Sequence, residues 1–109
     1  MKQRQITAAE ARRLEGADTT EKQFMADVMA RAKLGRWRVF HVWLSLHSTA
    51  GFPDLVLVRR GRLVFAELKK VGGKLSAEQR GWLEDLAATN TETYVWSPED
   101  WRQIERVLR

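Results

Sequence analysis

Two apolar segments joined by a very short link constrain the fold of this chain most strongly. Residues 54–58 and 63–68 carry mostly branched or aromatic side chains, as strands do when both of their faces are covered. Arg60-Gly61 lies between the two segments, and so short a link requires the strands to run antiparallel. The sequence therefore predicts a hairpin of two central strands, each covered on both faces.

Helix-start signals and further strand patterns flank this hairpin. Each helix start is a capping residue with an acidic or amide residue three positions later. The four pairs are Thr7 with Glu10, Asp18 with Glu21, Ser76 with Gln79, and Ser97 with Asp100. Residues 37–43 and 93–96 have the aromatic and β-branched composition of strands. The predicted order is α-α-β-β-β-α-β-α, which describes a single α/β domain.

Composition excludes several classes of protein. With 109 residues, of which 44% are apolar, the chain can fold as one globular domain. It has no cysteine, which excludes disulfide scaffolds, thiolate zinc sites and cysteine nucleophiles and indicates a reducing cytosol. No apolar run is long enough to span a membrane, and residues 1–16 lack the apolar stretch of a signal peptide. We therefore expect a cytoplasmic protein without a membrane partner.

The charge balance favours a polyanionic partner. Nineteen Lys and Arg against fourteen Asp and Glu leave a net charge of +5. A soluble protein whose surface is merely basic would have the same balance, so both interpretations stay open. The five tryptophans are expected to anchor the core or an interface; they are Trp37, Trp43, Trp82, Trp96 and Trp101.

Three charged residues lie on the hairpin at positions where a buried strand does not tolerate isolated charges. Asp54 begins one strand, and Glu67 and Lys69 lie at the end of the other. Residues two apart on a strand point to the same face of the sheet, so Glu67 and Lys69 share a side. Folding at Gly61 brings Asp54 alongside Glu67, because both lie about six or seven residues from the turn.

Two interpretations of this cluster remain open. Burying charges without partners is costly, so something must compensate them. In one interpretation the three residues form a salt-bridge cluster at the edge of an ordinary α/β interaction domain. In the other they form a divalent-metal site, because carboxylate oxygens suit Mg²⁺ or Mn²⁺ and a bound metal offsets the repulsion between carboxylates.

The motifs around the cluster resemble a known nuclease family. Pro53-Asp54, with Glu67-Leu68-Lys69 on the next strand, resembles the PD-(D/E)XK nuclease signature. The wider context resembles the compact, standalone VRR-NUC branch of that superfamily. The context consists of Gly51-Phe52-Pro53-Asp54-Leu55, Ala66-Glu67-Leu68-Lys69, Ser76 to Gln79 with Trp82, and Trp96-Ser97-Pro98. The resemblance runs from about Thr20 to the C-terminus, and only the first short helix falls outside it.

The resemblance implies a fold and an activity. The fold would be restriction-endonuclease-like, with a small mixed sheet flanked by helices, in a single domain 1–109 whose residues 1–17 form a helical extension. The activity would be that of a metal-dependent endonuclease, using Mg²⁺ or Mn²⁺ on branched DNA such as four-way junctions, in DNA repair. Standalone members resemble Holliday-junction resolvases, which implies a homodimer in the cytoplasm of a bacterial or phage-infected cell. The alternative is a DNA-binding subunit with the nuclease fold and no turnover of its own.

The resemblance also implies roles for individual residues. Asp54, Glu67 and the main-chain carbonyl of Leu68 would hold the metal. Lys69 would orient or help to deprotonate the attacking water and would stabilise charge on the phosphate. Glu21 would complete the metal ligands, and Gln79 would support the site from the third helix. Glu21 and Gln79 also fit as third members of capping boxes, and the helical spacing of Glu21 predicts that it faces inward.

Candidate DNA contacts lie on either side of these residues. His47 and Ser48 precede the Pro-Asp motif, where polar residues of the resembled family touch the scissile phosphate, and His41 is expected to be structural. Two groups of basic residues bracket the cluster in sequence: Arg31, Lys33, Arg36 and Arg38, and Arg59, Arg60, Arg62, Lys69, Lys70 and Lys74. They are either phosphate contacts or solvated surface. No motif for reading bases is present, so selectivity should come from DNA shape.

Overall fold

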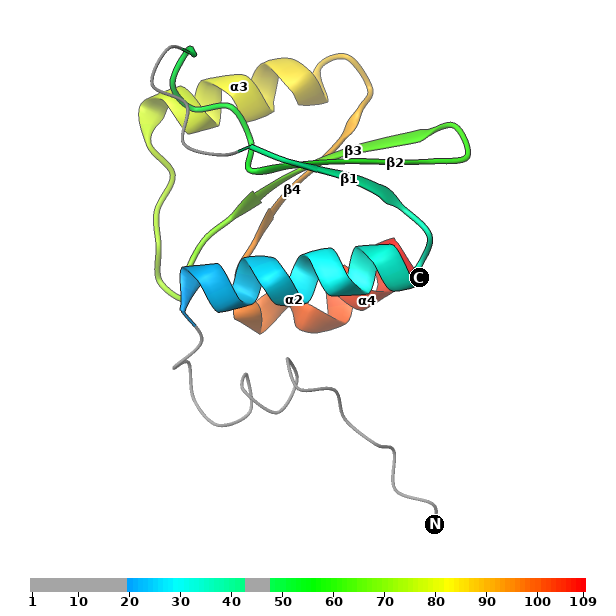
Figure 1. The fold of residues 1–109 in the computed structure, drawn as a ribbon. Helices are drawn as coiled ribbons and strands as arrows, with labels where there is room; N and C mark the ends of the chain where they lie inside the picture. The colour runs from blue at the N-terminus through cyan, green and yellow to red at the C-terminus, as the bar shows by residue number, and fades with distance from the viewer. Residues whose placement is uncertain (1–19, 43–47) are drawn as a thin grey trace.

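A computed structural model describes residues 20–42 and 48–109 of the chain. Its elements are α2 (Glu21–Leu34), β1 (Arg38–His41), β2 (Leu55–Arg59), β3 (Arg62–Leu68), α3 (Ala77–Ala87), β4 (Glu92–Trp96), the 3₁₀ turn η1 (Pro98–Asp100) and α4 (Trp101–Leu108). This order confirms the predicted one from the second helix onward (Figure 1). The first helix predicted after Thr7, and the caps Thr7 and Asp18, lie outside the described residues.

The four strands form one mixed sheet in the order β1-β2-β3-β4. β1 with β2 and β2 with β3 pair antiparallel, whereas β3 and β4 pair parallel. The two strands of the predicted hairpin are therefore the two central strands. α2 and α4 cover one face of the sheet, and α3 lies on the opposite face (Figure 1).

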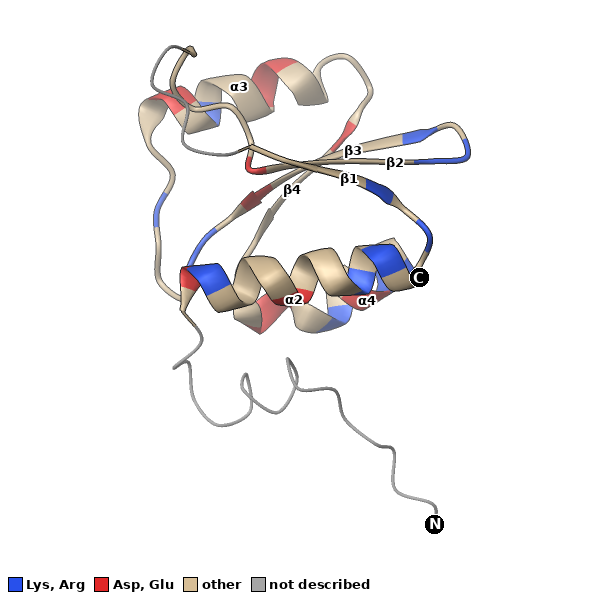
Figure 2. Ribbon diagram, viewed as in Figure 1, with Lys and Arg blue, Asp and Glu red and all other residues tan. Residues whose placement is uncertain are grey.

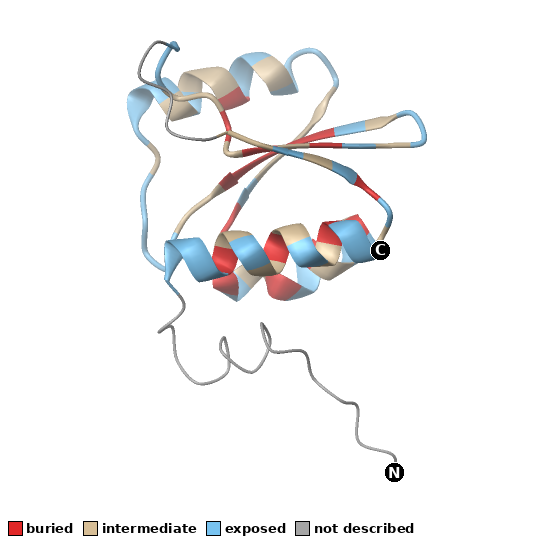
Figure 3. Cartoon of the chain, viewed as in Figure 1, coloured by how far each residue is buried: buried red, intermediate tan, exposed pale blue. Residues whose placement is uncertain are grey.

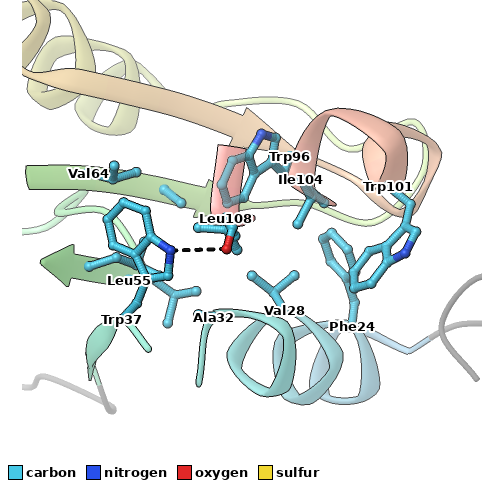
Figure 4. Packing of buried hydrophobic residues seen from close by; sticks show 12 residues of the cluster. Phe24, Val28, Ala32, Trp37, Leu55, Val64, Trp96, Trp101, Ile104 and Leu108 are labelled. Carbon is cyan, nitrogen blue, oxygen red and sulfur yellow. Dashed lines mark hydrogen bonds between the residues drawn. The ribbon is translucent and has the colours of Figure 1, made fainter. Parts of the chain in front are cut away.

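The hydrophobic core lies between the sheet and the pair α2 and α4. α2 contributes a stripe of buried side chains at four-residue intervals, as an amphipathic helix should. Together with sheet and α4 side chains they form one cluster: Phe24, Val28, Ala32, Trp37, Leu55, Leu57, Val64, Ala66, Trp96, Trp101, Ile104 and Leu108 (Figure 4). The Trp37 indole nitrogen donates to the Leu108 carbonyl at 3.1 Å, so this tryptophan joins the sheet side of the core to the end of α4.

The helix starts follow the predicted signals, with two corrections. The capping box of Ser76 and Gln79 is present at the start of α3. α2 begins at Glu21 and is capped by Thr20, whose hydroxyl accepts from the Gln23 amide at 3.0 Å, so the predicted start at Asp18 is two residues early. The Asp100 carboxylate accepts from the Ser97 amide at 2.9 Å, as the predicted capping signal requires, but the turn that Ser97 begins is the 3₁₀ turn η1, and α4 begins only at Trp101.

The prediction that both hairpin strands are covered on both faces is wrong at the end nearest the turn. Val58 and Leu63 are exposed there on the face of the sheet that carries α3. The reason is that α3 lies over the other end of the sheet, and the β2–β3 turn extends beyond it (Figures 1 and 3).

Two arginines near the turn, Arg59 and Arg62, bind other parts of the fold and lie away from the two carboxylates. Arg59 donates to the carbonyls of Gly35 at 2.8 Å and Arg109 at 2.7 Å, and its guanidinium lies 4.5 Å from the centre of the Trp37 ring. Arg62 makes a two-bond ion pair with Glu92, at 2.7 and 2.8 Å. Both residues lie at the opposite end of the hairpin from Asp54, although they bracket the charged cluster in sequence.

Candidate active site

The hairpin register brings Asp54 and Glu67 together at the end of the sheet away from the turn. Leu55 pairs with Ala66, so the preceding residue, Asp54, lies opposite Glu67 on the same face. The Asp54 carboxylate accepts a hydrogen bond from the Leu68 amide at 2.8 Å, which fixes it against the end of β3. The predicted convergence of the two carboxylates is confirmed.

Glu67 is the one buried charged residue among those that the structure describes, with 2% of its surface exposed. One oxygen, Oε2, accepts from the Gln79 side-chain amide at 2.9 Å and lies 3.8 Å from the Lys69 ammonium. The other, Oε1, is buried and has no hydrogen-bond partner within the described part of the chain. A buried acceptor without a partner is costly and marks a place for an incoming positive group.

The pKa of Glu67 is raised from 4.5 to about 7, chiefly by burial and then by the nearby Asp54 charge, while the Lys69 ammonium acts in the opposite direction. When ionised, both carboxylates only accept hydrogen bonds, so neither can donate one to the other. A shared proton or a bound cation removes this conflict. The site therefore favours binding of a positive charge between Asp54 and Glu67.

Gln79 has two functions in the structure. Its side-chain oxygen accepts from the Ser76 amide at 2.9 Å, which completes the capping box, and its side-chain nitrogen donates to Glu67. The capping contact and a contact to the candidate site are thus both present, and a supporting role of Gln79 stays a prediction. The start of α3 is tied to the buried carboxylate through this one side chain.

The loop before Asp54 packs closely on the start of α3. Gly51 has a φ of +96°, and a Cβ there would lie 2.6 Å from the carbonyl carbon of Glu78. Phe52 contacts Phe65 and Trp82 edge-to-face, with ring centres 5.7 and 5.1 Å apart. In the sequence, Gly51 and Phe52 stand out only as part of the motif before Pro53, although a glycine at such a position permits a close backbone approach.

The donors at this site fit a divalent metal ion in part. Asp54 and Glu67 supply hard oxygen atoms, one of which is buried without a partner, and the Leu68 carbonyl belongs to the next residue of the same strand. In residues 20–42 and 48–109, however, no group of three acidic or histidine side chains that could hold a metal comes together. Two carboxylates plus main-chain and water oxygens suit Mg²⁺, which usually keeps several of its waters.

Glu21 does not face the core. The prediction that its side chain points inward is wrong, because Glu21 is exposed in the first turn of α2 and the buried stripe begins only at Phe24. α2 lies on the face of the sheet opposite α3, whereas Glu67 points to the α3 side (Figure 1). A role of Glu21 at the metal therefore stays a prediction.

Two of the predicted DNA contacts, Lys70 and Lys74, follow the end of β3 that carries Glu67. Lys70 and Lys74 are exposed in the segment between β3 and α3 (Figure 2), where Gly72 has a φ of +79°. Ser48 is exposed ahead of the Gly51 loop, and His47 lies outside the described residues. His41 is partly buried at the end of β1.

Comparison with protein families assigns the chain to a class. The model of the VRR-NUC domain matches residues 9–97, and the chain therefore belongs to the VRR-NUC family of PD-(D/E)XK-like nuclease domains. The match begins earlier than the expected start near Thr20 and ends before α4. Comparisons with curated proteins and with solved structures give no significant match. No helix in the described residues is long and apolar enough to cross a membrane.

Proposed function

We propose that this nuclease domain is a metal-dependent, structure-selective DNA endonuclease that hydrolyses phosphodiester bonds in branched DNA such as four-way junctions. One observation carries the proposal. The buried Glu67 carboxylate has an unpartnered oxygen, faces Asp54, and lies beside Lys69. A salt bridge alone does not account for it, because one ammonium at 3.8 Å leaves two carboxylates to share a single counter-charge.

Asp54, Glu67 and the Leu68 carbonyl are the residues that would hold Mg²⁺ or Mn²⁺, with Glu21 as a further candidate. When bound, the metal supplies Lewis-acid stabilisation of the phosphate oxygen and a lowered pKa for the attacking water. Gln79 keeps Glu67 in position for this, because its amide nitrogen holds Oε2 and leaves Oε1 free.

Lys69 is the residue of this chain that acts on the substrate. Its ammonium lies on the same face as Glu67 and is largely withdrawn from solvent, so its charge is weakly screened. From there it orients the attacking water and stabilises the negative charge that develops on the phosphate. Lys70 and Lys74, together with His47 and Ser48, are the proposed contacts to the DNA backbone.

Two features support the preference for branched DNA. The sequence contains no motif for reading bases, and the exposed Lys70 and Lys74 make the surface near the site basic. Backbone contacts position DNA without reading its sequence, so a small domain of this kind selects by shape. Paired cuts in a four-way junction require two active sites related by a two-fold axis, which a homodimer provides.

Cleavage of labelled four-way junction, flap and duplex DNA tests the proposal. Each substrate is incubated with Mg²⁺, Mn²⁺ or EDTA, and wild type is compared with Lys69→Ala. The matched control is Arg102→Ala, which removes an exposed cation from α4 on the other side of the sheet. We expect metal-dependent cutting by wild type and by the control, and its loss in Lys69→Ala. Equal cutting by Lys69→Ala would contradict the role of Lys69.

A second candidate is a DNA-binding subunit with the nuclease fold and no turnover. The observation in its favour is that Asp54 and Glu67 gain no third acidic side chain in the described part of the chain. A protein that binds Mn²⁺ and DNA but cuts no substrate under any condition would support this candidate over the endonuclease.

A further inference from the structure

Within residues 20–42 and 48–109, no helix or loop covers an apolar patch on the α3 side of the sheet. Phe40 on β1 is 64% exposed, Val58 on β2 is 42% exposed and Leu63 on β3 is 40% exposed. Arg38, which pairs with Val58, is exposed, and so is Arg60 in the turn two residues after Val58; we refer to these five residues as the open patch. Phenylalanine side chains are usually buried, because their burial stabilises the fold. A largely exposed phenylalanine within a strand is therefore unusual.

The open patch shares its sheet face with the candidate active site. Phe40 pairs with Val56, which pairs with Phe65, and Phe65 packs against the Phe52 ring beneath α3. Glu67 lies two residues further along β3, so its side chain points to the same side. From standard strand spacings, the Phe40 backbone lies about 8 Å from Asp54 and about 12 Å from Glu67.

The charge around the open patch indicates an anionic partner. Glu67 is the only acidic residue within β1, β2 and β3, so no negative side chain on these strands offsets Arg38 or Arg60. The turn end of the hairpin and the start of β1 are correspondingly rich in basic residues (Figure 2). Two copies joined through this patch would bring like charges together, which is unfavourable.

We propose that the open patch binds unpaired nucleotides next to the cleavage site, with a base stacked on Phe40 and phosphates held by Arg38 and Arg60. The inference rests on the proposed nuclease function and names the part of a branched substrate that the protein recognises. Base faces are hidden inside a duplex, whereas single strands and branch points expose them to aromatic side chains. An exposed aromatic ring beside arginines is the usual means of binding single strands without reading sequence.

Binding of a fluorescein-labelled 12-nucleotide oligo(dT), measured by anisotropy in EDTA so that nothing is cut, tests the role of Phe40. We expect Phe40→Ala to weaken binding about tenfold, because the ring no longer stacks on a base. Phe40→Trp should retain the wild-type affinity. Phe40→Leu keeps apolar area but no ring, and should weaken binding as Phe40→Ala does.

The matched control is Leu34→Ala, which removes an exposed apolar side chain (77% exposed) from α2 on the other side of the sheet. It should leave oligo(dT) binding unchanged. Arg38→Gln and Arg60→Gln should each reduce the dependence of log affinity on log salt concentration by about 0.7, the value for one phosphate contact on a single strand. Thermal unfolding of every variant checks that the fold is intact.

Two outcomes would overturn the inference. The first is oligo(dT) binding that is the same in wild type and Phe40→Ala. The second is a wild-type dimer in sedimentation that Phe40→Ala converts to a monomer with unchanged oligo(dT) affinity, which would make the patch an interface between copies. The junction-cleavage assay separates these results from failure of the proposed function. Metal-dependent cutting with no effect of Phe40 rejects only this inference, and absence of cutting rejects the nuclease.

Discussion

At the scale of single residues, the molecule is organised around the side chain of Glu67. Its position on a central strand buries the carboxylate, while Asp54 on the neighbouring strand adds a like charge. Gln79 and Lys69 compensate only one of its two oxygens. The fold thus carries an electrostatic cost at this point, as binding and catalytic sites commonly do.

The first prediction concerns the pH dependence of stability in the metal-free protein. The pKa of Glu67 is raised from 4.5 to about 7 in the folded protein. Between these values the folded state binds more protons than the unfolded chain, so the free energy of unfolding decreases as pH rises. We expect a loss of about 3 kcal/mol between pH 4 and 8 from this group, measured by thermal unfolding in EDTA.

The matched variants for that experiment are Glu67→Gln and Glu84→Gln. Glu67→Gln removes the titrating group and should flatten the profile, whereas Glu84 is exposed on α3 and its replacement should leave the profile unchanged. Mn²⁺ added at pH 8 should restore stability to wild type and not to Glu67→Gln. A pH profile in Glu67→Gln that matches wild type would show that another group is responsible.

The second prediction separates the two functions of Gln79. Ser76→Ala removes the N-cap of α3 and should cost about 1 kcal/mol of stability while leaving Gln79 able to hold Glu67. Gln79→Ala also removes the hydrogen bond to Glu67, the carboxylate proposed to bind the metal, and should lower cleavage of junction DNA by about 10- to 100-fold. Equal cleavage rates in the two variants, measured with saturating Mn²⁺, would assign Gln79 a capping role alone.

At the scale of the elements, the loop before β2 and the start of α3 form one unit. The close approach of Gly51 to the Glu78 backbone and the edge-to-face contact of Phe52 with Trp82 position Asp54 and Gln79 relative to each other. α3 thereby covers the carboxylate end of the sheet and leaves the turn end open. The same placement of one helix thus produces both the buried site and the open patch.

The third prediction concerns Gly51. Gly51→Ala places a methyl group against the backbone of α3 at a positive φ. The backbone strain of alanine at such a φ costs about 1 kcal/mol by itself. Because the methyl group also clashes with α3, the free energy of unfolding should fall by well over that amount. Gly61→Ala is the matched control, because Gly61 has a φ of +80° and nothing within 4 Å of an added Cβ. Urea unfolding of both variants gives the difference. If the two variants lost the same free energy of unfolding, α3 would have moved away from the added methyl group at no energetic cost.

At the scale of the whole molecule, Trp37, Trp96 and Trp101 and the apolar face of α4 belong to the hydrophobic core. Trp101, Ile104 and Leu108 of α4 are buried against α2 and the sheet, so this face of α4 is core and does not supply a dimer interface. Leu83 is the buried residue of α3. The homodimer proposed above would therefore not form through these buried side chains.

The fourth prediction is that oligomeric state. Sedimentation equilibrium at micromolar concentration should give twice the chain mass of 12.6 kDa, because two active sites related by a two-fold axis are needed for paired cuts. The measurement is repeated in high salt to exclude association through the basic surface. A monomer under both conditions would count strongly against symmetric cleavage of four-way junctions.

The sequence alone determined the order of the described elements, the central hairpin and the pair Asp54 and Glu67. These features depend on residue type and spacing: apolar runs make strands, Arg60-Gly61 makes a turn, and two equal distances from a turn place residues opposite each other. The capping box of Ser76 and Gln79 was predictable for the same reason, since it involves residues only three apart.

Only the tertiary structure decided what each side chain meets. The contact of Gln79 with Glu67, the exposure of Glu21, the clamping of Trp37 by Arg59 and the open patch around Phe40 all depend on where helices lie on the sheet. Local sequence sets the period of an element, but the length and placement of a covering helix set how much of a sheet it buries. An apolar strand residue is therefore predicted as core whether or not a helix reaches it, and here α3 ends before the row that carries Val58 and Leu63.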